Sequence, residues 1–89
     1  MESSRSQRIG EILLNKKLIL PKVKYKLSEI YKIIEENAVL FEEDWGEEEN
    51  GDIKWQHTTR RLIQEWDNKR SVLSKREVTH YGNSEYSFQ

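Results

Sequence analysis

The sequence contains no cysteine and only one proline, and the missing cysteine alone excludes several classes of protein. Without thiols there is no disulfide framework, no thiolate zinc site and no cysteine nucleophile. No apolar run approaches the roughly 20 residues that a membrane-spanning helix needs. The first ten residues, MESSRSQRIG, lack the apolar centre of a signal peptide. We therefore expect a cytoplasmic protein with no membrane segment.

Side chains for catalysis are also scarce. The two histidines, His57 and His80, stand far apart in the sequence, which is a poor basis for a metal site. Asp52-x-Lys54 is the one fragment similar to a metal-nuclease motif, and it fits a turn that leads into a helix. There is no glycine-rich phosphate loop. We predict that this segment is not an enzyme and needs neither a metal nor a cofactor.

What the chain does have is charge, unevenly distributed along its 89 residues. Residues 1–37 carry eight Lys/Arg and five Asp/Glu, net +3. Residues 38–53 carry seven acids and no base, net −7. Residues 54–80 carry seven bases and three acids, net +4. The total is only −1, but the pattern is two basic segments separated by an acidic one, and distribution matters more for nucleic-acid binding than the sum.

A chain of this length forms one small domain with a modest core. We expect Trp45, Trp55 and Trp66 to supply much of that core. Residues 1–24 are expected to form a polar arm with a short helix over 7–18, and residues 25–89 the folded domain. The helix of the arm has enough apolar residues to pack against the domain or against a second copy, and its lysines offer a phosphate contact as an alternative.

Three further elements are expected before residue 54. The alternation over residues 22–26 indicates a strand or the entry to a helix. A helix follows over 27–37, with Ser28 as its N-cap and Asn37 as its terminator. A short helix or turn near residues 40–45 should be anchored by Phe41 and Trp45. The acidic stretch 42–52 then reads as a solvated loop ending in a turn, or as a contact for a basic protein partner.

Residues 54–70, KWQHTTRRLIQEWDNKR, form the most informative stretch. At about 100° per residue, one face of this predicted helix is apolar and the other polar. The apolar stripe consists of Trp55, Thr59, Leu62, Ile63 and Trp66. The polar face consists of His57, Arg60, Arg61, Gln64 and Asn68. Arg, Gln and Asn are the side chains whose fork geometry matches guanine and adenine edges in the major groove, although a solvated polar face is the common alternative.

A basic hairpin is expected directly after this helix. Strand-like segments at 71–78 and 85–88 flank a turn at 81–84. The fold class that follows is mainly α with a small β-hairpin, laid out as a winged helix-turn-helix with an extra amino-terminal helix. The 54–70 helix would enter the major groove of double-stranded DNA, and the 71–88 hairpin would lie on the backbone. The expected phosphate contacts are Lys69, Arg70, Lys75 and Arg76.

The chain also resembles a known family over about residues 25–89. The resemblance lies in Leu27 to Ala38, in a helix that has a tryptophan near each end, and in a hairpin that ends in aromatic residues. The residues that carry it in the helix and the hairpin are Trp55, Thr59, Arg61, Ile63, Gln64, Trp66, Gly82, Tyr86 and Phe88. These segments are similar to the winged-helix domains of bacterial and phage restriction endonucleases, including the amino-terminal domain of Mrr-type enzymes. The resemblance implies a DNA-binding module within, or working beside, such a nuclease.

A second function stays open at this point. The same fold could serve as a protein-interaction module, as a partner adaptor or a phage-type inhibitor that uses the acidic 42–52 loop. A homodimer through the amino-terminal helix is a further possibility. The position of the acidic residues relative to Arg60 and Arg61 discriminates between these functions, because acids on the same side would cancel the field that attracts phosphate.

Overall fold

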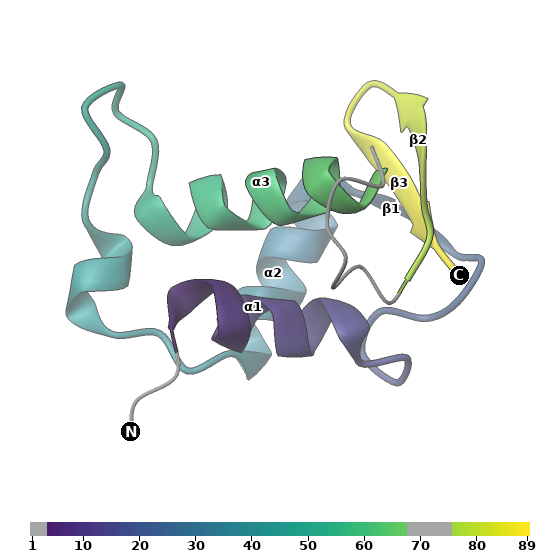
Figure 1. Ribbon diagram of the computed structural model, residues 1–89, viewed down its shortest axis with the longest axis horizontal. Coiled ribbons are helices and arrows are strands. Elements are labelled where there is room, and N and C mark those ends of the chain that lie inside the picture. Colours follow the sequence, from purple (N-terminus) through teal and green to yellow (C-terminus); the bar gives the residue numbers. More distant parts are fainter. Residues whose placement is uncertain (1–3, 68–75) are drawn as a thin grey trace.

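The computed structural model describes residues 4–67 and 76–89. Within those ranges the chain forms three α-helices, one 3-10 helix (η1) and three strands, in the order α1, β1, α2, η1, α3, β2, β3. Helices α1 and α3 lie side by side, and the sheet is at one end of them (Figure 1). Helices with a small β-element agree with the sequence, but the arrangement is of the α+β kind, and the sheet has three strands rather than the two of a hairpin.

The sheet is antiparallel, with strand order β1-β3-β2. Its strands are β1 (Lys24–Lys26), β2 (Val78–Gly82) and β3 (Glu85–Phe88). The alternation over 22–26 therefore marks a strand. Strand β2 runs on to Gly82, and the turn is narrower than expected because Asn83 and Ser84 take the positive φ angles, 50° and 59°.

Helix α1 (Arg5–Leu14) starts and stops earlier than the sequence suggested. The Ser4 hydroxyl accepts the N–H of Gln7 at 3.1 Å, which caps the first turn. The helix ends before Lys16 because the Asn15 side chain accepts the N–H of Lys17 at 2.9 Å. The lysines at 16 and 17 consequently lie in a turn.

Helix α2 (Leu27–Asn37) matches its predicted range but not its predicted cap. Ser28 lies within the first turn. The Glu29 carboxylate instead accepts the N–H of Lys26 at 2.9 Å, where an anion is also favoured by the helix dipole. Asn37 is the last residue, and its side chain donates to the carbonyl of Ile33.

One hydrophobic core joins all three helices and the sheet. Its fully buried members include Ile9 and Leu13 of α1, Ile34 of α2 and Phe88 of β3. Ile9 and Leu13 of α1 are used inside the chain, whereas Ile12 and Leu14 of the same helix are only partly buried. Trp55 and Trp66 belong to the core as expected, whereas Trp45 is 44% exposed and packs edge-on against the Trp55 ring.

The segment between α2 and α3 is ordered by a buried carboxylate. η1 (Glu42–Trp45) holds Asp44, which is 0% exposed. Asp44 accepts from Nε of Arg5 at 2.7 Å, from Nη1 of Arg8 at 2.7 Å and from the N–H of Phe41 at 2.8 Å. The expected anchors Phe41 and Trp45 keep 39% and 44% of their surface exposed, but both make contacts. The Arg8 guanidinium lies over the Phe41 ring, 4.6 Å from its centroid, and Trp45 packs against Trp55, so the buried carboxylate and the aromatic pair hold this segment together.

Candidate nucleic-acid interface

Helix α3 (Lys54–Asp67) has the two faces that its sequence predicts. All five residues of the expected apolar stripe are buried: Trp55, Thr59, Leu62, Ile63 and Trp66. The opposite face carries His57, Arg60, Arg61 and Gln64, each partly or well exposed. Because α1 and the sheet cover the other sides of α3, this polar face is the one the helix presents to solvent (Figure 1).

Arg60 is already engaged by a carboxylate. Its Nη2 atom donates to Oδ2 of Asp52, just before the helix begins, and the two side chains form an ion pair. The Nδ1 atom of His57 lies 3.8 Å from the same Oδ2 oxygen. The hydrogen bond from Arg60 is the main cause that lowers the pKa of Asp52. Arg60 therefore has only part of its guanidinium available for another acceptor.

Arg61 points toward α1. Its Nη2 atom donates to the hydroxyl of Ser6 at 2.6 Å, and its Nη1 atom lies 3.7 Å from the carboxylate of Glu65. Gln64 is exposed beside it. A shallow depression of about 240 Å³ gathers these side chains on the surface, lined by Asp52, His57, Arg60, Arg61 and Gln64. The structure thus brings together four of the five side chains predicted for base contacts.

Arg76 is not where the sequence placed it. The prediction put it on the hairpin surface as a phosphate contact, but it is only 4% exposed. Its Nη1 atom donates to the carbonyl of Leu13 at 2.8 Å, and its Nε atom donates to the carbonyl of Gln89 at 2.9 Å. Burial lowers the pKa of its guanidinium. In this position it stabilises the fold and does not reach a phosphate.

Four other predicted contacts lie outside the described residues: Asn68, Lys69, Arg70 and Lys75.

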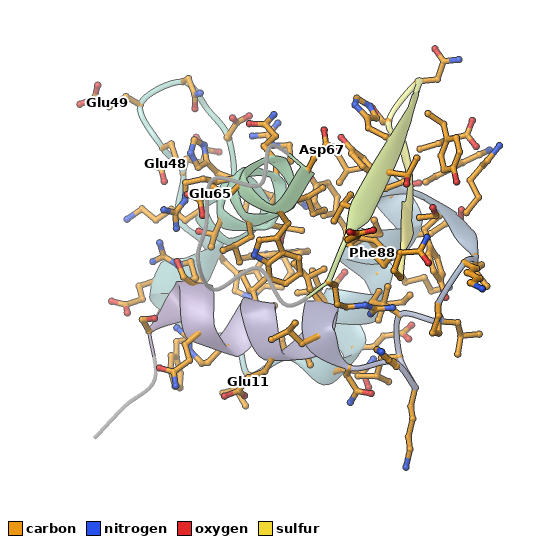
Figure 2. The ribbon with its side chains drawn as sticks, turned by 45° about the vertical axis from the view of Figure 1, so that its right-hand side comes forward. Glu11, Glu48, Glu49, Glu65, Asp67 and Phe88 are labelled. Carbon is orange, nitrogen blue, oxygen red and sulfur yellow. The ribbon has the colours of Figure 1, made fainter. Side chains whose placement is uncertain are left out.

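Acidic residues stand on and beside the same helix. Figure 2 shows Glu48 and Glu49 on the loop that precedes α3, and Glu65 and Asp67 on α3 itself. The loop is a defined turn, because the carbonyl of Asp52 accepts the N–H of Glu48 at 2.7 Å. These carboxylates weaken the positive potential around the polar face. The sequence predicted the acidic loop, but it did not predict that Asp52 at the end of this loop would pair with Arg60.

Two aromatic contacts on the sheet were missed at the level of sequence. The imidazole of His80 stacks on the Tyr86 ring, with centroids 4.6 Å apart. The ammonium of Lys24 lies over the Tyr81 ring, 4.5 Å from its centroid. The alternation of polar and aromatic residues in the hairpin pointed to strands, but it did not indicate which rings would meet. Tyr86 faces α3. Burial is the main cause that raises the pKa of its hydroxyl group, and the nearby Asp67 carboxylate raises that pKa further.

Comparisons with other proteins do not assign this chain to a family, so its function is inferred from the geometry alone. No family model, no curated protein and no solved structure matches this chain. Within residues 4–67 and 76–89, no three His, Asp or Glu side chains gather as metal ligands. None of the helices in the described part of the chain is long and apolar enough to cross a membrane.

Proposed function

We propose that this chain is a DNA-binding module of the winged helix-turn-helix class, with α3 in the major groove and the β2–β3 hairpin against the backbone. The observation that carries the proposal is the outward polar face of α3, held beside a small sheet by α1 and α2. The order of the elements supports the proposal, because three helices precede a hairpin and the hairpin comes after α3 along the chain.

The residues assigned to DNA are those of α3 that remain accessible. Arg61 and Gln64 are exposed, and Arg60 and His57 adjoin them in the same depression. Arg and Gln pair with guanine and adenine edges in the major groove. Arg76 is withdrawn from this set because its guanidinium is buried. In line with the family resemblance, we propose that the module recognises DNA for a restriction-type endonuclease and carries no catalysis itself.

The test is a gel shift with random duplex DNA, titrated with salt. We expect binding that weakens as salt rises, because each neutralised phosphate releases counterions. Arg61→Glu should reduce affinity by at least about tenfold and lower the salt slope by about one. Lys32→Glu, an equal charge change at an exposed position on α2, should have a much smaller effect. Asp52→Asn should tighten binding, because it releases Arg60. Absence of binding at low salt, or wild-type affinity of Arg61→Glu, would rule the proposal out.

A protein-interaction module is the second candidate, and one observation favours it. Asp52 occupies part of Arg60, and the acidic loop stands beside the start of α3. Both features suit a basic protein partner better than a phosphate backbone. If duplex DNA does not bind in the gel shift and acidic-loop variants instead lose a protein partner, this candidate replaces the first.

A further inference from the structure

The large apolar side chains left exposed on this chain are not scattered. Six of them are exposed among residues 4–67 and 76–89. Val39, Phe41 and Trp45 lie within one short segment, and Leu20 and Val23 lie within another. The sixth, Tyr81, packs under the Lys24 ammonium that follows Val23. Single exposed apolar residues are normal on a protein surface. Exposed apolar residues that gather in two groups, each surrounded by charged side chains, indicate surfaces that contact another molecule.

The first group lies within the acidic segment, and we call residues 39–49 the acidic end. Val39 is 60% exposed, Trp45 44% and Phe41 39%. Around them stand five carboxylates that take no part in an ion pair among the described residues: Glu42, Glu43, Glu47, Glu48 and Glu49. The other acid of this segment, Asp44, is buried and bound by Arg5 and Arg8, so it does not contribute to the outer surface.

The second group lies within a segment of lysines, and we call residues 16–26 the basic end. Leu20 is 47% exposed and Val23 39%. Five exposed lysines accompany them, again without an ion pair inside the described ranges: Lys16, Lys17, Lys22, Lys24 and Lys26. No acid interrupts this segment. The acidic end exposes three large apolar side chains and the basic end two, and each end carries five charges of opposite sign.

The two ends also face away from each other. Figure 1 shows the acidic end in teal on one side of the molecule and the basic end in dark blue on the other. They cannot meet within one chain, but they can meet between two. We propose that copies of this chain associate head to tail, with the basic end of one copy docked on the acidic end of the next.

A second copy fits these surfaces because every copy carries both halves of the contact. Apolar side chains at the centre exclude water, and the surrounding charges set orientation and speed of encounter. In a pair of copies such a heterologous contact leaves one acidic and one basic end open, so further copies can add until the assembly closes into a ring or continues as an open chain. Screening by salt should weaken it, because the charges are exposed.

The experiment is sedimentation analysis of the whole chain over a range of concentrations at low and high salt. We expect the average mass to rise with concentration at low salt and to return to that of one chain at high salt. Two variants test the ends separately. Glu47→Lys with Glu49→Lys alters the acidic end, and Lys16→Glu with Lys17→Glu alters the basic end. Each should weaken self-association by at least about tenfold, because two of the five charges at the altered end are reversed and most of its attraction for the other end is lost.

Mixing the two variants gives the decisive measurement. The first retains a native basic end and the second a native acidic end, so the mixture should associate at least about tenfold more tightly than either variant does alone. Glu11→Lys with Glu77→Lys makes the same charge change as the acidic-end variant, but outside both ends, and should associate like wild type. A thermal melt of each variant confirms that it is folded. A wild type that stays a single chain at low salt, variants that still associate, or a mixture that does not, would each overturn the proposal.

Discussion

Asp44 is fully buried, yet its carboxylate receives hydrogen bonds from two guanidinium groups and one backbone N–H. Burial alone would raise the pKa of Asp44, because it penalises the charged form. The bonds from Arg8, Phe41 and Arg5 outweigh that effect and hold the pKa well below its usual range. A carboxylate ionised inside the fold therefore ties η1 to α1.

This linkage gives a stability that depends on pH. The pKa of Asp44 is lower in the folded chain than in the unfolded chain, where an Asp titrates near roughly 3.9. Its stabilisation is thus complete above that value and declines as the pH falls below it. Asp44→Asn should lower the free energy of unfolding by about 3 kcal/mol at neutral pH, because Arg5 and Arg8 lose a buried partner.

Denaturant unfolding at neutral pH and at roughly pH 2 checks this prediction. The difference between wild type and Asp44→Asn should shrink at the acidic pH, where the wild type has lost part of the contribution. Glu42→Gln, an exposed neighbour in η1, should unfold like wild type at both values. A difference that stays constant with pH would show that the charge of Asp44 is not what stabilises the segment.

At the scale of elements, α1 is held at both ends by side chains from distant parts of the chain. Asp44 of η1 binds its first half, and Arg76 binds the Leu13 carbonyl in its last turn. Arg76 also lies over the Phe88 ring, 5.4 Å from its centroid, so it joins the helix to the sheet.

Arg76→Met should therefore act on the fold and not on DNA. The loss of two hydrogen bonds from a charged donor should lower the free energy of unfolding by about 2 to 3 kcal/mol. The duplex affinity of the folded variant, and its salt slope, should remain those of wild type. A slope reduced by about one with little loss of stability would restore Arg76 as a phosphate contact.

The helices show how much of this structure local sequence can predict. The apolar stripe of α3 follows from its spacing alone, and all five of its predicted residues are buried. The range of α2 follows from a similar periodicity. The alternation over 22–26 left a strand and the entry to a helix open, and strand β1 covers only Lys24–Lys26. The partners of the charged residues do not, because they depend on how distant segments meet. Arg76 bonds to a carbonyl 63 positions away, and no local pattern separates it from a surface arginine.

In the candidate site, too, the local helical spacing could be predicted from the sequence and the long-range partners of the charged residues could not. The sequence placed His57, Arg60, Arg61 and Gln64 on one face because helical geometry is regular. It did not place Asp52 against Arg60, since that pairing needs the acidic loop to fold back on the helix. Nor did it indicate that Arg61 would bond to Ser6 of α1, which is 55 positions away.

At the scale of the whole molecule, the two proposals interact. The acidic end lies at the end of the molecule where α3 begins, so in a lone copy its carboxylates repel the DNA backbone (Figure 1). In a head-to-tail assembly the lysines of a neighbour would cover those carboxylates. Each bound copy would thereby improve the binding of the next, which is cooperativity with a physical cause.

Duplex length should expose this coupling. On a duplex long enough for several copies, binding curves should be steeper than for independent sites, and on a duplex for one copy they should not. Glu47→Lys with Glu49→Lys should bind the short duplex more tightly than wild type, because two acids near α3 are gone, and should lose cooperativity on the long one. Glu11→Lys with Glu77→Lys, with the same net charge, should keep it. If the acidic-end variant stays as cooperative as wild type, the covering of acids by a neighbour is not what couples the copies, even if DNA binding itself holds.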